Sequence, residues 1–270
     1  MSENKKQKQK QSVAGTILWW SILLIAIGIF AFSLYKLVPI LLEYREGTVE
    51  YDDIKQFVAI APGTGAGEDE QDRELIVGEE EAEPGPQVDF AGLREINEDV
   101  RGWIFVEALE DINYPIVHGN DNDYYLHRTF KRTYNFAGSI FLEATNKPDF
   151  SDSHNIVFGH NMKNGSMFGQ LHKFRDKEVY DKSRYFWICT PQKNYKYEIF
   201  SVQDVLSGGD AYLLFSGPGP ELLQYAKEMK RQSEVPTPDI NFTEQSKIVT
   251  LSTCTTNSIR RLIVQGVLVN

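Results

Sequence analysis

The first apolar stretch of the chain is long enough to cross a lipid bilayer. Residues 13–35 read VAGTILWWSILLIAIGIFAFSLY and contain no charged side chain, and about twenty apolar residues span a membrane as a helix. A secretory signal would carry a shorter apolar region and a small-residue cleavage site, whereas the sequence after Phe32 is SLYK. We therefore expect a retained transmembrane helix over residues 13–38; the alternative is a buried core helix.

The charges that flank this stretch predict its direction. The preceding tail, residues 1–12, holds several basic side chains: Lys5, Lys6, Lys8 and Lys10. The sequence after the stretch soon becomes acidic, and lysines close to a membrane span stay in the cytoplasm. We expect a single-pass protein of the cell membrane with a cytoplasmic N-terminus and an extracellular domain.

A polar segment separates the apolar helix from the rest of the chain. Residues 63–86 read GTGAGEDEQDRELIVGEEEAEPGP, in which glycine, proline and acidic residues dominate. Such a stretch buries too little apolar surface to offset its ordering entropy. We expect residues 39–87 to form an extracellular segment with an acidic, solvated linker, and residues 88–270 to form the folded domain.

Short β-type patterns dominate residues 88–270. Runs of β-branched and aromatic residues, bounded by Gly, Pro, Asn and Asp, predict about eight strands. They are GWIFV, INYPIV, GSIFLE, HNIVFGH, YFWICT, YKYEIFSV, KIVTLST and RLIVQGVLV. Helical spacing is found in FAGLREINEDV near the start of the domain and again in the segment PELLQYAKEMKRQ. The pattern indicates a mainly β barrel or sandwich with peripheral helices.

Composition and charge narrow the classes of function. The 270 residues carry a formal charge of -10, which argues against a nucleic-acid binder because such proteins present a basic face to phosphates. The two cysteines are too few for a disulfide framework or a thiolate-only zinc site. No HExxH helix occurs and the acidic residues cluster in the linker, so we expect no metal and no cofactor.

Cys254 is the first candidate for chemistry. It ends the run KIVTLST and precedes the small polar residues TTNS, so a strand carries its thiol to the edge of the sheet. A reactive thiol needs its thiolate stabilised by a histidine or another cation. The alternative for any lone cysteine is a small buried hydrophobic residue, and we expect that role for Cys189 within YFWICT.

His160 and Arg261 are the candidate partners of this thiol. His160 closes HNIVFGH and opens the polar loop NMKNGSMFG, whereas Arg261 begins the strand after Cys254. If the last two strands pair, the guanidinium of Arg261 reaches the acyl site and stabilises a tetrahedral intermediate, while Arg260 points to the other face. The alternatives are a surface histidine and a solvated arginine at the sheet edge.

The same residues carry a resemblance to a known family. TLSTC at 250–254, RRLIVQG at 260–266 and FGHNMKNGSMFGQL at 158–171 look like a sortase of class B. The similarity runs from about Gly92 to Val269 and includes GWI, NYPIV, DNDYYL and AGSIF in the expected order.

The resemblance implies a fold and a reaction. The fold is an eight-stranded sortase-type β-barrel with peripheral helices, including an extra helix near 221–231. The implied reaction is cysteine transpeptidation with His160, Cys254 and Arg261 as catalytic residues, in which the thiolate and imidazolium are an ion pair in a minority of molecules. It further implies substrate contacts at Ser252, Tyr212 and Leu213. Similar enzymes often carry an acidic residue just after the cysteine, where this chain has Thr255.

The implied partners lie outside a Gram-positive cell. They are surface proteins with an NPxTx-like C-terminal sorting signal and, as acceptor, an amine of a peptidoglycan precursor. A pilin lysine is the alternative acceptor, and water is the acceptor if the enzyme is a cysteine peptidase. A membrane-tethered binding module without activity is the remaining alternative.

Overall fold

The computed structural model describes residues 13–60, 85–254 and 259–269. The chain divides into two compact units, Met1–Glu46 and Gly47–Asn270. The greater part of the acidic linker expected at 63–86 lies outside the described residues, as does the loop 255–258 that follows Cys254.

The N-terminal apolar stretch forms the helix α1 (Val13–Ile54). Its most apolar 18-residue window has a mean hydropathy of 2.4, and none of that window is buried within the protein. By length and composition the helix can cross a membrane, as expected. It continues past the predicted end at residue 38, through Pro39 and the helix-favouring sequence ILLEYRE.

The ordered domain begins earlier in the structure than the expected start at residue 88. Tyr51 and Ile54 on the last turns of α1 are buried, and the 3₁₀-helix η1 (Lys55–Phe57) leads into β1 (Val58–Ala59). β1 pairs antiparallel with β2 (Gln87–Val88). Sequence patterning overlooked these residues because acidic side chains interrupt the apolar positions around Tyr51.

The core of the domain is a closed eight-stranded barrel, as the sequence predicted, with the order β10-β8-β7-β3-β4-β5-β6-β9. Its strands are β3 (Val100–Val106), β4 (Asn113–Val117), β5 (Ile140–Leu142), β6 (His154–His160), β7 (Tyr185–Cys189), β8 (Asn194–Leu206), β9 (Ile248–Cys254) and β10 (Arg260–Leu268). Two neighbouring pairs, β4–β5 and β6–β9, are parallel and the others are antiparallel. Parallel neighbours need long crossover connections, and these connections carry most of the helices and loops around the barrel.

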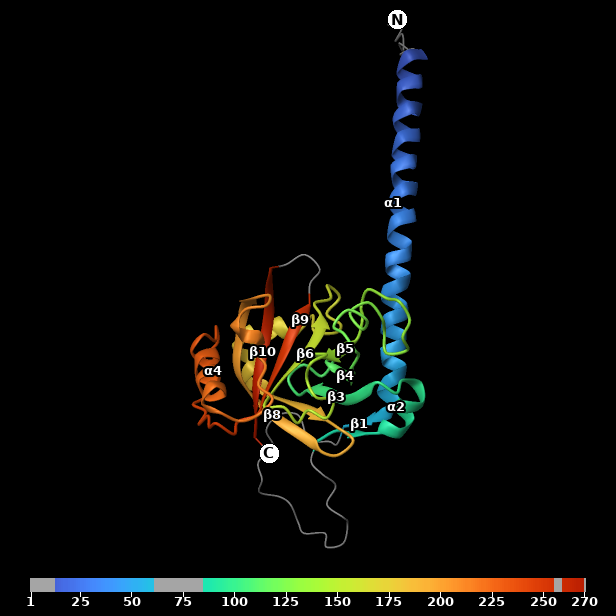
Figure 1. The fold of residues 1–270 in the computed structure, drawn as a ribbon. Coiled ribbons are helices and arrows are strands. Elements are labelled where there is room, and N and C mark those ends of the chain that lie inside the picture. Colours follow the sequence, from blue (N-terminus) through green and yellow to red (C-terminus); the bar gives the residue numbers. More distant parts are fainter. Residues whose placement is uncertain (1–12, 61–84, 255–258, 270) are drawn as a thin grey trace, which may run out of the picture. The chain divides into compact units, whose positions relative to one another are not determined.

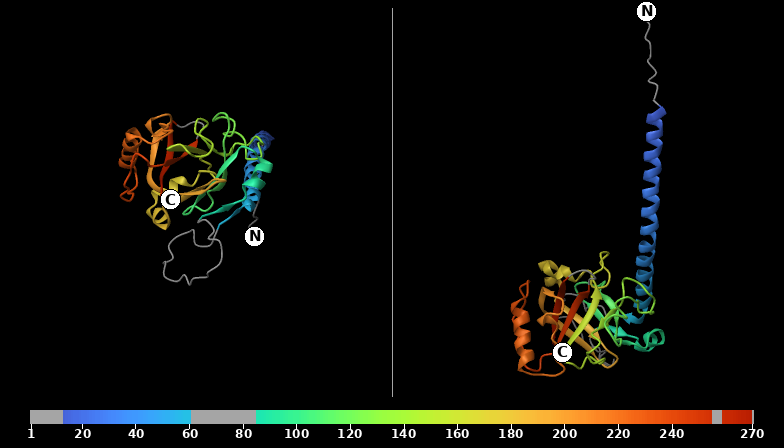
Figure 2. Two further views of the ribbon diagram at one scale, coloured as in Figure 1. Left: turned by 60° about the horizontal axis from the view of Figure 1, so that its bottom comes forward. Right: turned by 45° about the horizontal axis from the view of Figure 1, so that its top comes forward.

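Helices flank the barrel on opposite sides (Figures 1 and 2). α2 (Phe90–Ile96) lies near β3, and α4 (Pro220–Arg231) lies against β8 and β10. The shorter elements are η2 (Leu171–Arg175), α3 (Lys177–Lys182) and η3 (Asp210–Tyr212). α4 buries Leu222, Tyr225, Ala226 and Met229 against the outer surface of the barrel, which is the apolar face that its sequence spacing predicted.

The buried hydroxyl of Tyr51 ties the end of α1 to the barrel connections within the Gly47–Asn270 unit. It donates to Gly138 O at 2.7 Å, and Phe130 N donates to it at 3.3 Å. We expect Tyr51→Phe to lower the free energy of unfolding of the Gly47–Asn270 fragment by about 1–3 kcal/mol, because buried polar partners are left unsatisfied. Denaturant titration measures this. The matched control is Tyr134→Phe at an exposed ring, and equal effects in the two variants would contradict the assignment.

Candidate active site

The parallel pairing of β6 and β9 brings His160 next to Cys254. The two residues are partners in the strand register, and each is the last residue of its strand. The next residue along the chain, Asn161, donates its N–H to the carbonyl of Cys254 at 3.1 Å. Residues directly opposite each other in a ladder point to the same side, so the imidazole and the thiol share one face.

Arg261 completes the group from the third strand. Ile263 of β10 pairs with Ser252 of β9, and continuing that antiparallel register by two residues places Arg261 opposite Cys254. The Nη1 atom of Arg261 lies 3.9 Å from Cys254 Sγ. Its Nε–H is buried and has no hydrogen-bond partner among the described residues. A donor of this kind is available to an oxyanion that forms at the thiol.

The neighbouring arginine has a different environment. Arg260 is exposed, and its Nη2 donates to the carbonyl of Asp204 at 2.8 Å. Successive residues of a strand point to opposite faces. The structure therefore places the two arginines as the sequence predicted, with only Arg261 beside the thiol.

The site lies on the outer surface of the barrel. Residues two apart on β9 share a face, so Cys254 continues the row of Ile248, Thr250 and Ser252. α4 lies outside the barrel (Figure 1), and its buried side chains cluster with Ile248 and Ile263. The thiol therefore stands at the end of this outward-facing row and does not point into the barrel core.

At the end of β9, a side chain that the sequence analysis did not single out forms hydrogen bonds to β10. The hydroxyl of Thr253 donates to the carbonyl of Leu262 and accepts from its N–H, both at 3.1 Å. These two bonds join β9 to β10 one residue before Cys254. The threonine in TLSTC thus has a structural role that the motif alone did not reveal.

A backbone carbonyl sets the tautomer of His160. The ring Nε2 lies 2.7 Å from the carbonyl oxygen of Leu126, and because a carbonyl only accepts, Nε2 carries the proton in the neutral ring. Nδ1 then holds the lone pair and is the nitrogen that can exchange a proton. Leu126 belongs to the crossover between the parallel strands β4 and β5, a contact that no sequence spacing indicates.

Burial favours the neutral forms of both Cys254 and His160. It raises the pKa of the Cys254 thiol to about 11, although the positive charge of Arg261 acts in the opposite direction. Burial likewise lowers the pKa of His160, and the hydrogen bond to the Leu126 carbonyl only partly offsets this effect. At neutral pH the thiol and the neutral imidazole predominate, so the thiolate–imidazolium pair is a minor species.

The residues expected to contact substrate lie close together on this outer face. The hydroxyls of Tyr212 and Ser252 are 2.9 Å apart, and the Tyr212 ring stacks on Phe158 with a centroid distance of 6.4 Å. Ser252 is fully buried, whereas Leu213 has 51% of its surface exposed. Leu213 is therefore accessible beside this row, and Ser252 lies beneath the tyrosine.

A buried network of hydrogen bonds holds the Tyr212–Leu213 segment in place. His154 Nδ1 lies 2.6 Å from the carbonyl of Leu213, and its Nε2 lies 2.7 Å from the hydroxyl of Thr250. Gln265 donates to Thr250 at 2.9 Å and to the hydroxyl of Tyr225 at 2.7 Å. Burial lowers the pKa of His154 to about 4, so a neutral ring donates to Leu213 and accepts from Thr250. His154 supports the Tyr212–Leu213 segment and lies at the end of β6 opposite His160.

The second cysteine has the core role that the sequence predicted. Cys189 ends β7, is fully buried, and forms no disulfide. Burial raises the pKa of its thiol to about 12. Because β7 pairs antiparallel with β3, which runs in the same direction as β6, Cys189 lies at the opposite end of the barrel from Cys254.

Comparisons with known proteins bear on the family of the chain. Residues 104–269 match the sortase domain family. Sortase B of Listeria monocytogenes is 33% identical over 256 residues, which cover 92% of this chain and 96% of the relative. Sortase B of Staphylococcus aureus is 25% identical over 220 residues, which cover 82% of each protein. The crystal structure of sortase B from Bacillus anthracis in complex with AAEK1 superposes with a TM-score of 0.68 at 30% identity, covering 86% of this chain and 100% of that one.

The raised pKa of Cys254 predicts a distinctive reactivity with pH. The rate of iodoacetamide alkylation at Cys254 is expected to rise about tenfold per pH unit from pH 7 and to level off only near pH 11, because only the thiolate reacts. Peptide mapping separates Cys254 from Cys189. Arg261→Gln is expected to slow the reaction at every pH below the plateau. A plateau already reached below pH 8 would instead show a ground-state thiolate.

Proposed function

Because the chain belongs to the sortase family, class B, and is therefore a cysteine transpeptidase, we propose that Cys254 is its nucleophile, His160 its general acid and base, and Arg261 its oxyanion stabiliser. One observation carries this proposal: the register pairs His160 with Cys254 while Arg261 Nη1 lies 3.9 Å from the thiol. Three strands that meet at one barrel end supply a nucleophile, a titratable ring and a fixed cation.

The proposed first half-reaction forms a thioester. The Cys254 thiolate attacks the carbonyl carbon of the scissile peptide bond, and the negative charge that develops on the oxygen is stabilised by the buried, unpaired Nε–H of Arg261. His160 gives its Nδ1 proton to the leaving amine as the C–N bond breaks. The Leu126 carbonyl keeps Nε2 protonated and so directs this exchange to Nδ1.

The proposed second half-reaction transfers the acyl group to an amine. The acceptor nitrogen attacks the thioester carbon, the C–S bond breaks, and the nitrogen loses a proton to His160 Nδ1. The products are an amide and the thiolate–imidazolium pair, which relaxes to the neutral form. Water in the same position would give hydrolysis, so the identity of the acceptor distinguishes a transpeptidase from a peptidase.

We further propose that the donor is the C-terminal sorting signal of a secreted protein, of the NPxTx type, and that the acceptor is an amine of peptidoglycan. Similarity to the sortase B proteins supports both assignments. The signal would lie along the outer face of β9 beside Tyr212 and Leu213, with Ser252 beneath it, and its scissile bond at Cys254. Pilin polymerisation through a lysine uses the same chemistry and is the second candidate.

The proposed location is the outer side of the cell membrane. α1 supplies the anchor by its length and hydropathy, and the lysines at positions 5, 6, 8 and 10 favour a cytoplasmic N-terminus. A catalytic domain outside the membrane has access to secreted proteins and to the wall.

The full chain in detergent, incubated with NPxTx-type and LPxTG-type peptides with and without an amine, tests the proposed function. We expect cleavage of the first peptide and an amine-dependent ligation product in mass spectra, both absent with Cys254→Ala. Cleavage of that peptide by water alone, with no ligation product at any amine concentration, would favour the peptidase. Ligation that persists in Cys254→Ala would disprove the assignment of the nucleophile.

Arginine substitutions test the role of the cation separately. Arg261→Lys is expected to lower kcat/KM for the donor peptide by about tenfold to a hundredfold, because a point charge does not replace the planar fork. The matched control, Arg260→Lys, changes an exposed residue on the other face and is expected to retain kcat/KM within about twofold. The reverse ranking of the two variants would contradict the strand register.

A further inference from the structure

A polar cavity opens at the same barrel end as Cys254. Its volume is about 410 Å³. Most of its lining comes from the loop 161–173 that follows His160, and Asp111 adds a carboxylate from the β3–β4 turn. None of the proposed donor contacts Ser252, Tyr212 and Leu213 lines it. The cavity is therefore distinct from the surface along which the donor is proposed to lie.

The wall of the cavity is bonded directly to the proposed catalytic pair. Asn161 lines the cavity and donates its N–H to the carbonyl of Cys254 at 3.1 Å. Farther along the loop, Phe168 donates its N–H to the carbonyl of His160 at 3.0 Å. A molecule held in this cavity thus lies against backbone that is hydrogen-bonded to both proposed reacting residues.

The loop has a specific shape that maintains the cavity. Gly165 has a φ of +83°, which favours glycine. At Gly169 a Cβ atom would meet the Met162 carbonyl at 2.3 Å, so only glycine permits this close approach of two backbone segments. The N–H of Met167 donates to the hydroxyl of Tyr114 on β4 at 3.1 Å. The two glycines let the loop fold tightly on itself, and the bond to Tyr114 anchors it to the barrel.

Charged side chains of both signs surround the opening. Lys173 donates to Gln170 at 2.6 Å, and Gln170 donates to Asp111 at 2.8 Å, so these three side chains form one hydrogen-bonded wall. Lys163 is exposed and has no side-chain partner within the parts of the chain that the structure describes. Its ammonium is available to an anionic group that enters the cavity.

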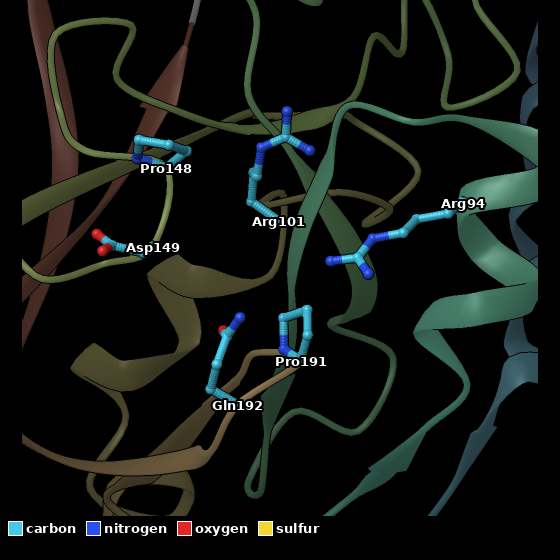
Figure 3. Close-up of a pocket in the computed structure, with 6 residues that line it drawn as sticks. All are labelled: Arg94, Arg101, Pro148, Asp149, Pro191 and Gln192. Atoms are coloured by element: carbon cyan, nitrogen blue, oxygen red, sulfur yellow. The ribbon is translucent and has the colours of Figure 1, made fainter.

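A second cavity lies far from the thiol. It measures about 200 Å³ and is lined by Arg94, Arg101, Pro148, Asp149, Pro191 and Gln192 (Figure 3). The start of β3 and the turn after β7 contribute to it, so it lies at the end of the barrel opposite Cys254. An acceptor amine bound there does not reach the thioester.

We propose that the cavity of the 161–173 loop binds the acceptor, and that Lys163 selects amines whose own chain carries a carboxylate. This inference rests on the proposed transpeptidase function and specifies the substrate of its second step. The carboxylate pairs with the Lys163 ammonium while the amine extends past Asn161 to the thioester. The amine nitrogen then bonds to the acyl carbon, sulfur leaves as thiolate, and His160 accepts the proton from nitrogen.

Two acceptors that differ by a single carboxylate test the proposal. L-lysine and cadaverine both present a primary amine on a five-carbon chain, and only L-lysine carries a carboxylate. With full-length protein in detergent and a cleavable donor peptide, Lys163→Gln is expected to lower the ratio of ligated to hydrolysed peptide with L-lysine by about two- to fivefold, the effect of one partly exposed ion pair. With cadaverine the ratio is expected to remain the same.

The matched control is Lys227→Gln, which removes an exposed lysine on α4 and is expected to change neither ratio. An equal fall with both amines, no fall with L-lysine, or a similar fall in Lys227→Gln would overturn the role of Lys163. A loss of ligated and hydrolysed products together would also overturn it, because that result places Lys163 in the donor step.

A binding measurement tests the acceptor site independently of enzyme activity. In full-length Cys254→Ala protein, titration with L-lysine is expected to shift the backbone amide resonances of Asn161 and Gly165, and Lys163→Gln is expected to abolish the shifts. Absence of these shifts in the presence of an intact Lys163 would disprove the site whether or not any donor is cleaved. If the shifts occur but the donor peptide is not cleaved, the result counts against the proposed function and not against the acceptor site.

Discussion

The pairing of β6 with β9 is the constraint on which the rest of the site depends. These strands are parallel, so their C-terminal residues His160 and Cys254 meet at one end of the barrel. Parallel neighbours cannot be joined by a tight turn, and the long connection between them includes β7, β8 and α4. The same connection brings Tyr212 back across the face that carries the thiol.

Burial at this barrel end opposes the ionisation that the chemistry requires. It raises the pKa of Cys254 and lowers that of His160, so charge separation between them is disfavoured in the resting protein. Arg261 is the nearby positive charge that favours the thiolate. Its Nη1 lies beside sulfur while its Nε–H lacks a partner among the described residues. In the proposed mechanism, one side chain therefore stabilises both the thiolate and the oxyanion that forms when the thiolate attacks the carbonyl.

Transpeptidation requires two substrates to reach one thioester carbon in turn. Tyr212 and Leu213 lie over the outer face of β9, where the His154 network holds them. The polar cavity of the 161–173 loop lies on backbone hydrogen-bonded to His160 and Cys254. Under the proposed assignment of donor and acceptor to these two places, the acceptor can approach while the acyl chain is still bound, and an amine that excludes water favours transfer over hydrolysis.

Local patterns in the sequence determined the eight strands, the apolar helix and the late amphipathic helix, because side-chain periodicity reports which face of an element is buried. They also singled out His160, Cys254 and Arg261 as strand-end residues. Only the tertiary structure decided that Leu126 holds the imidazole, that Thr253 closes the end of β9, and that Tyr51 belongs to the folded domain. Each of these contacts joins residues whose proximity depends on strand pairing or on a crossover connection, and such pairings leave no periodic signal in the chain.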